Sequence, residues 1–193
     1  MYEIPTSVII EDKSYTIREK GDFRMVLDCF KALEDEQLTK QERLISSLII
    51  FYEDVNSLAD IAELPDLEKA VTGMYDFFNC GETDPLTKNL PYKLIDWEKD
   101  SQLVSSAVNK VANKEVRLEE YIHWWTFVGY YMAIGESLLS SIISIRHKIM
   151  TGEKLEKYER KFRLENPQYF NWNYQTLEQR EAENLIHELW NSG

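Results

Sequence analysis

Residues 121–149 read YIHWWTFVGYYMAIGESLLSSIISIRHKI and form the densest apolar stretch of this 193-residue sequence. Two adjacent tryptophans, Trp124 and Trp125, lie near the start of the stretch. Residues 121–135 carry no charge, but this run is shorter than the roughly 20 apolar residues that a membrane-spanning helix needs. The sequence therefore predicts a helix that is buried in a protein core or against a partner, and not a transmembrane segment.

The helix expected over residues 118–135 is apolar over most of its circumference. One apolar stripe contains Leu118, Tyr121, Ile122, Trp125, Val128 and Met132, and a neighbouring stripe contains Trp124, Phe127 and Tyr131. A helix of this kind has to be covered on several sides, so it is either the hub of the core or partly covered by another chain. Both interpretations stay open, and the aromatic candidates for partner binding are Trp124, Trp125, Phe127 and Tyr131.

Apolar residues at helical spacing continue on both sides of this segment. A helix is expected to begin after Asp22, and another follows Thr39 and Glu42, which have the spacing of a capping box. Further helices are expected from Pro65 to Phe78 and over residues 96–112, 136–150, 154–164 and 175–190. Near the N-terminus, residues 8–10 and 15–17 flank a polar turn and indicate a hairpin. The predicted fold is therefore mainly α, a multi-helix globular bundle of about eight helices with a small N-terminal β-hairpin.

Residues 79–95 contain two prolines and a glycine and lack helical periodicity, which is typical of a long loop. A chain of this length can build one core of ordinary size. We therefore expect a single domain over residues 1–193, and any internal boundary is expected in the loop 79–95.

The net charge of −12 is concentrated in the first half of the chain. Residues 1–100 hold 22 acidic and 11 basic side chains, whereas residues 101–193 hold 12 and 11. Because such a charge repels phosphate backbones and anionic lipids, we expect neither nucleic acid nor membrane as a partner. Residues 1–10 lack a basic segment and a long apolar core, so no secretory signal is predicted and the expected location is cytoplasmic.

Residues 146–163 form a cationic segment with seven basic and three acidic side chains. A solvated helix face is the commoner explanation for such a segment. The alternative is a docking surface for an acidic partner, such as the acidic half of a second copy of the chain. The candidate residues for that surface are Arg146, Lys157, Arg160 and Lys161.

The sequence contains no Gly-rich phosphate loop and none of the GxSxG, HExxH or CxxC patterns. Two Glu-x-x-x-His pairs, Glu119 with His123 and Glu183 with His187, could bind a metal from facing helices. Acidic helical chains produce such pairs by chance. We therefore expect no metal, no cofactor, no catalytic residues and no enzymatic activity, and a metal-dependent helical enzyme is the alternative hypothesis.

The segment Asp22-Phe23-Arg24 is interpreted as structural. Asp22 stands at an N-cap position, and a buried pair between Asp22 and Arg24 would tie the following helix to the hairpin.

Four segments resemble the bacteriophage gene product fifteen family. They read YTIREKGDFR (15–24), IDWEKDSQLVSSAV (95–108), YIHWWTFVGYYMAI (121–134) and IISIRHKIMTGEKLEKYERKFRLENPQYF (142–170). The resemblance covers residues 5–170, and its most specific parts are residues 22–24, residues 123–127 and the pair Ile145-Arg146. The segment 171–193 is not matched, and its role is left open.

The resemblance implies a small protein encoded in the tail-morphogenesis region of siphophages or prophages of Gram-positive bacteria. Genes just before the tape measure gene in that region encode tail assembly chaperones, which coat the tape measure protein until tail tube subunits replace them. The implied function is a non-enzymatic tail morphogenesis factor that resembles a tail assembly chaperone, in the cytoplasm of the bacterial host. Its implied partner is the tape measure protein or another tail structural protein, and/or a second copy of itself, and the resemblance transfers no active site.

Overall fold

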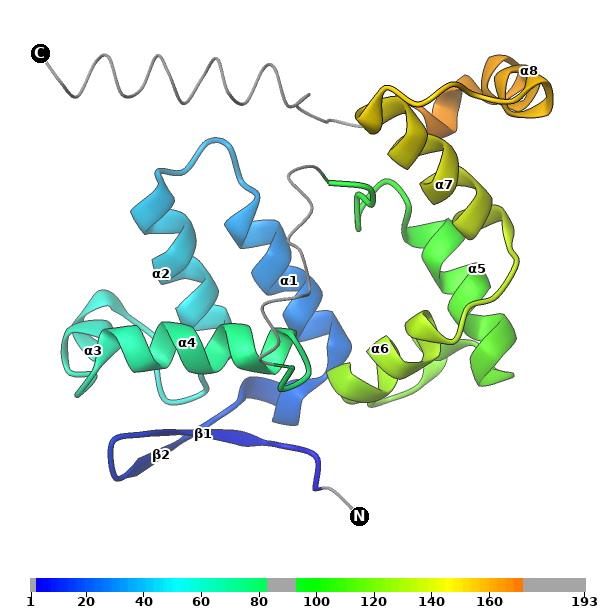
Figure 1. The fold of residues 1–193 in the computed structure, drawn as a ribbon. Helices are drawn as coiled ribbons and strands as arrows, with labels where there is room; N and C mark the ends of the chain where they lie inside the picture. Colours follow the sequence, from blue (N-terminus) through cyan, green and yellow to red (C-terminus); the bar gives the residue numbers. More distant parts are fainter. Residues whose placement is uncertain (1–2, 83–92, 172–193) are drawn as a thin grey trace, which may run out of the picture. The chain divides into compact units, whose positions relative to one another are not determined.

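The computed structural model describes residues 3–82 and 93–171 of the chain, shown in colour in Figure 1. These residues form two strands, eight α-helices and three short 3-10 helices. The strands and α-helices are β1 (Ser7–Ile10), β2 (Lys13–Thr16), α1 (Phe23–Leu33), α2 (Lys40–Phe51), α3 (Leu58–Ala62), α4 (Leu67–Phe78), α5 (Ser101–Ala112), α6 (Trp124–Met132), α7 (Leu138–Thr151) and α8 (Lys157–Glu165). The 3-10 helices are Arg18–Gly21, Val116–Leu118 and Pro167–Tyr169. The prediction of a mainly α fold with a small N-terminal hairpin is confirmed.

The chain divides into two compact units. Unit 1 consists of Met1–Pro85 and Val116–Met132, and unit 2 consists of Leu86–Glu115 and Ala133–Gly193. Unit 1 contains the hairpin, α1 to α4 and α6, whereas unit 2 contains α5, α7 and α8. The expected single domain over residues 1–193 stays a prediction. No helix within residues 3–82 and 93–171 is long and apolar enough to span a lipid bilayer.

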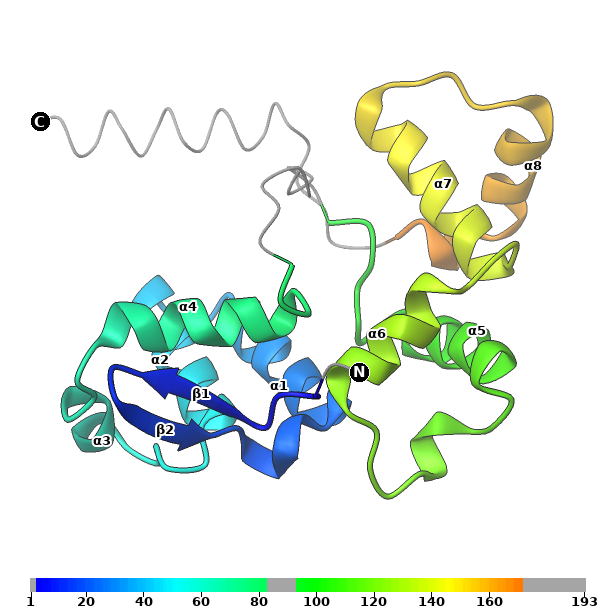
Figure 2. The same ribbon diagram turned by 60° about the horizontal axis from the view of Figure 1, so that its bottom comes forward.

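In unit 1 the hairpin lies against α4, and β1 runs beside that helix (Figure 1 and Figure 2). The two strands are antiparallel, with Ser7 opposite Thr16 and Ile10 opposite Lys13. A Cβ atom at Gly73 of α4 would overlap Cγ1 of Val8. The glycine therefore allows α4 and β1 to approach closely.

The C-terminal end of α2 is fixed by the side chain of Arg18. Its guanidinium donates hydrogen bonds to the carbonyl oxygens of Ile49, Ile50 and Tyr52, at 3.0, 3.1 and 2.9 Å. The last carbonyls of a helix lack partners within the helix, so N–H donors from a side chain satisfy them. A positive charge at this end also interacts favourably with the negative end of the helix dipole. The fully buried Tyr52 extends the same network, because its hydroxyl donates to the carbonyl of Ala70 at 2.8 Å.

The predicted caps of α1 and α2 are present. Thr39 and Glu42 form a capping box, and the Asp22 side chain accepts a hydrogen bond from the backbone N–H of Arg24. The buried carboxylate of Asp22 also forms a salt bridge with the Arg24 guanidinium at 2.9 Å. One detail of the prediction was wrong. The pair ties α1 to the segment before α6 and not to the hairpin, since Asp22 accepts from the N–H of Ile122 and Arg24 donates to the carbonyl of Glu119.

These long-range hydrogen bonds also shorten the helix that was expected over residues 118–135. Residues 119–122 are not helical, and α6 begins only at Trp124. The helix expected from Asp96 also begins later, since residues 97–100 form turns and α5 begins at Ser101. The Asp96 side chain caps these turns by accepting from the N–H groups of Glu98 and Lys99. The five-residue helix α3 was not predicted, and the helix expected over 175–190 lies outside the described residues.

In unit 2, α7 packs against α5, and α8 contacts the 3-10 helix Pro167–Tyr169. The buried Met150 of α7 forms a small apolar cluster with Leu94, Ile149 and Phe170. Phe170 also makes an edge-to-face contact with Phe162 of α8, with ring centroids 6.0 Å apart. This cluster holds the end of α7 and the chain after α8 together.

Candidate partner-binding surfaces

Two of the aromatic candidates on α6 are core residues of unit 1. Trp124 is 4% exposed, and its indole N–H donates to the carbonyl of Phe78 at 2.9 Å. Phe127 is 2% exposed, and its ring stacks on Phe23 with centroids 4.4 Å apart. The structure therefore places Trp124 and Phe127 inside the chain, where they support the surface instead of contacting a partner.

The other two aromatic candidates, Trp125 and Tyr131, are half-buried. The indole N–H of Trp125 donates to the carbonyl of Phe77 at 2.9 Å, so its only polar atom is satisfied within the chain. Met132 is 72% exposed, and nothing lies within 4 Å of a Cβ built on Gly129. Residues 125, 129 and 132 recur at i, i+4 and i+7, and we call this exposed stripe the α6 face.

His123 precedes α6 and is 3% exposed. Its Nδ1 atom lies 3.1 Å from the N–H of Trp125, and its Nε2 atom lies 3.0 Å from the carbonyl of Pro5. A carbonyl only accepts and an N–H only donates, so these partners assign the proton to Nε2 and leave Nδ1 as an acceptor. The neutral ring therefore caps the start of α6 and holds the N-terminal segment.

We expect the stability of the protein to fall as the pH is lowered below about 6.5, partly because of His123. Burial lowers the pKa of His123 from its ordinary value of 6.5, against weaker opposing effects from the Pro5 carbonyl and the Asp22 carboxylate. The unfolded chain thus binds the proton first, and protonation of Nδ1 in the folded chain removes the hydrogen bond from Trp125. Urea unfolding at several pH values measures this loss.

The variant His123→Gln serves as the control for this titration, because glutamine does not ionise in the same range. Its stability should change less than that of the wild type between pH 7.5 and pH 5.5. An identical pH dependence in the two proteins would contradict the assignment to His123.

The structure also bears on the metal hypothesis. Among the residues that the structure describes, no group of three or more His, Cys, Asp or Glu side chains could hold a metal ion. Both ring nitrogens of His123 already bind the backbone, while Glu183 and His187 lie outside the described residues. Burial also raises the pKa of the Cys29 thiol to about 12, which keeps it protonated and unreactive at neutral pH.

In unit 2, Arg146 is the most deeply buried charged residue among the described residues, with 1% of its surface exposed. Its guanidinium forms two hydrogen bonds with the buried carboxylate of Asp100, at 2.5 and 2.9 Å. It also donates to the carbonyl oxygens of Leu94 and Tyr169. Arg146 therefore joins three segments of unit 2 from inside, and it is not part of a cationic surface.

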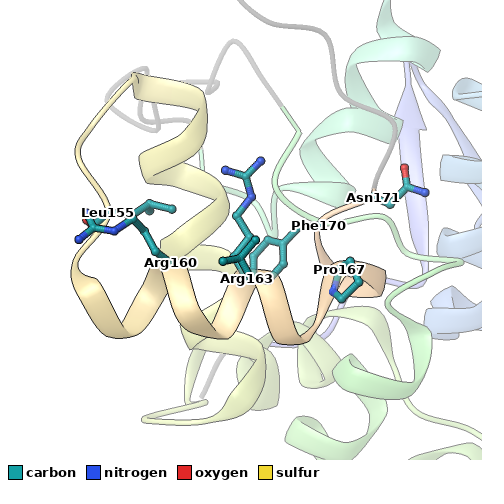
Figure 3. A pocket seen from close by; sticks show the side chains of 7 residues that line it. Leu155, Arg160, Arg163, Pro167, Phe170 and Asn171 are labelled. Atoms are coloured by element: carbon teal, nitrogen blue, oxygen red, sulfur yellow. The ribbon is translucent and has the colours of Figure 1, made fainter.

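The remaining basic candidates, Lys157, Arg160 and Lys161, are exposed on α8. Arg160 also lines an open groove of about 620 Å³, shown in Figure 3, whereas Lys157 and Lys161 are not among its lining residues. The groove is lined by Leu155, Arg160, Arg163, Leu164, Pro167, Phe170 and Asn171. We call it the α8 groove, and it combines an apolar floor with two guanidinium groups.

Arg163, Leu164 and Phe170 line this groove but were not among the candidates predicted from the sequence. The spacing of residues 160, 163 and 164 places them on one face of α8, and this pattern was available in the sequence. The position of Phe170 in the groove could not be predicted from the sequence, because it depends on the turn of the chain after α8. Figure 3 shows that Pro167 and Phe170 follow the helix, and both side chains line the groove.

The profile of a family described as Bacteriophage Gp15 protein matches residues 1–169. Searches of curated proteins and of solved structures gave no match. The matched region contains every strand and helix described above, including both candidate surfaces up to Tyr169. The chain therefore belongs to the Bacteriophage Gp15 protein family.

Proposed function

We propose that this phage protein is a non-enzymatic tail morphogenesis factor that acts like a tail assembly chaperone and binds a helical segment of the tape measure protein. The resemblance that the family match supports implies a gene in the tail-morphogenesis region. The observation that carries the proposal is the α6 face, where Trp125, Gly129 and Met132 lie in one stripe on the surface. A chaperone needs an apolar surface that binds its partner and later releases it.

The α6 face is suited to an amphipathic helix. The Trp125 ring offers a rigid apolar surface without an unsatisfied polar atom, and the flexible Met132 side chain can adapt to different apolar partners. Between them, Gly129 has no side chain, which lets a partner helix approach the backbone of α6 closely. Recognition of a helix by its apolar face requires this combination of anchors and open space.

The structural roles of the ionisable groups support a function without catalysis. His123, Asp22 and Arg146 all bind backbone groups and fix the segments around them. Each of these side chains has its hydrogen-bonding capacity directed into the fold. Their arrangement is that of a scaffold that presents surfaces to a partner.

The variant Gly129→Arg is expected to weaken binding of the co-expressed tape measure protein by about tenfold or more, which corresponds to about 1.4 kcal/mol. A long charged side chain at this position blocks the α6 face. We expect the fold to be kept, because a Cβ at residue 129 contacts nothing within 4 Å. The measured quantity is the dissociation constant of the purified variant for the immobilised tape measure protein.

Two variants serve as controls for this experiment. Gly129→Ala keeps the face open and should bind nearly as well as the wild type, while stabilising the helix by about 0.5–1 kcal/mol. Gln41→Arg adds the same charge at an exposed position of α2 in the same unit. The proposal fails if the wild type does not capture the tape measure protein, or if Gly129→Arg and Gln41→Arg bind equally well.

A further inference from the structure

The α8 groove carries two arginine side chains whose positive charge can bind a partner. The guanidinium of Arg163 makes no hydrogen bond or salt bridge with any other described residue, and that of Arg160 donates one hydrogen bond, to the carbonyl of Leu155 at 2.6 Å. Leu164, beside them, is 81% exposed. An exposed leucine beside two arginines fits a partner surface that presents apolar side chains together with carboxylates.

A short segment of unit 1 in the same chain has that composition. Residues 53–68 contain six acidic side chains and no basic one. Glu63 and Glu68 are exposed, and neither carboxylate forms a salt bridge with another described residue. Leu58 and Leu67 are 65% and 46% exposed. We call these four residues, which lie on α3, on the turn after it and at the start of α4, the acidic corner.

We propose that the acidic corner of one copy of this protein docks in the α8 groove of a second copy. In this contact the carboxylates of Glu63 and Glu68 face the guanidinium groups of Arg160 and Arg163. The exposed leucines of the corner pack against Leu164 and Phe170. Arg163 thereby gains an anionic partner, which no salt bridge with another described residue supplies.

The two surfaces are different, so each contact uses the groove of one copy and the corner of another. The second corner and groove of a joined pair either bind each other, which closes a two-fold dimer, or bind further copies. The contact therefore produces a two-fold dimer, a ring or an open chain of copies. It involves neither the α6 face nor a tail protein, and it is independent of the function proposed above.

The test uses the purified full chain and measures its average mass by light scattering at rising protein concentration. The wild type is expected to increase in mass with concentration, and added salt should reverse the increase because exposed charges are screened. A groove variant, Arg163→Glu with Leu164→Ser, and a corner variant, Glu63→Lys with Leu58→Ser, should each stay monomeric. Circular dichroism checks that both variants keep the helix content of the wild type.

Mixing the two variants gives the decisive result. The groove variant keeps an intact corner and the corner variant keeps an intact groove, so an equal mixture should form a dimer and grow no further. Charge reversals outside both surfaces, Lys154→Glu and Asp12→Lys, should assemble like the wild type. The proposal is overturned if the wild type remains monomeric, if either variant still assembles, or if the mixture stays monomeric.

Discussion

Replacing Asp100 by alanine is expected to lower the free energy of unfolding by about 3–5 kcal/mol. The variant removes the Asp100 carboxylate that pairs with the guanidinium of Arg146, which is 1% exposed. The carbonyl groups of Leu94 and Tyr169 remain as its partners, but they carry no full charge. Removal of one member of a buried ion pair costs more than the pair itself contributes, because the other charge remains desolvated. Urea unfolding followed by circular dichroism measures the change.

An exposed ion pair provides the control for this prediction. Lys161 and Glu165 form a salt bridge at 3.7 Å on the surface of α8, and Glu165→Ala should change stability by less than about 1 kcal/mol. The double variant Asp100→Leu with Arg146→Met should lose less stability than the sum of the two single variants, since it leaves no unpaired charge. A loss below 1 kcal/mol for Asp100→Ala would show that the buried pair is not the element that holds unit 2 together.

The sequence could not reveal the role of Arg146. It stands at the start of a cationic segment, and charge counting therefore assigned it to a surface with Lys157, Arg160 and Lys161. Its partner Asp100 is 46 positions away along the chain, and the two carbonyl groups come from still other segments. The spacing of residues in the sequence predicts which side chains share a helix face. It does not predict which distant charged residue packs against that face.

Local features were predicted with more success than distant ones. The Asp22 cap and the capping box of Thr39 and Glu42 depend on residues two or three positions apart, and both are present. The start of α6 was placed too early, because Asp22 binds the backbone of Ile122, 100 positions away. The apolar pattern of residues 118–122 is compatible with a helix. In the folded chain, however, the Ile122 N–H binds the carboxylate of Asp22, and the helix starts after this contact.

The two adjacent tryptophans show the same limit within the candidate site. Both lie in the predicted apolar helix, and each donates its indole N–H to a carbonyl near the end of α4. Only Trp124 also packs between Phe30 and Phe127 in the core of unit 1. The helical pattern predicts that both are apolar contacts, but only the path of α1 and α4 around α6 decides which ring is covered.

Trp124→Ala is therefore expected to destabilise the protein by about 3–5 kcal/mol, as is usual for truncation of a buried aromatic residue. Trp125→Ala should cost less than half as much, because the Trp125 ring is only half-buried. Trp124→Phe, which keeps most of the apolar volume but leaves the Phe78 carbonyl without its donor, should cost about 1–3 kcal/mol. Urea unfolding of the three variants under identical conditions gives these differences.

The same variants separate folding from partner binding. If the α6 face binds the tape measure protein, Trp125→Ala should weaken that binding while the protein stays folded, because the variant removes an anchor of the exposed stripe. Trp124→Phe should bind like the wild type, since its ring lies beneath the surface. Equal losses of stability for Trp124→Ala and Trp125→Ala, with unchanged binding for both, would mean that the two indoles are equivalent core residues. In that case the α6 face would have no anchor for a partner helix.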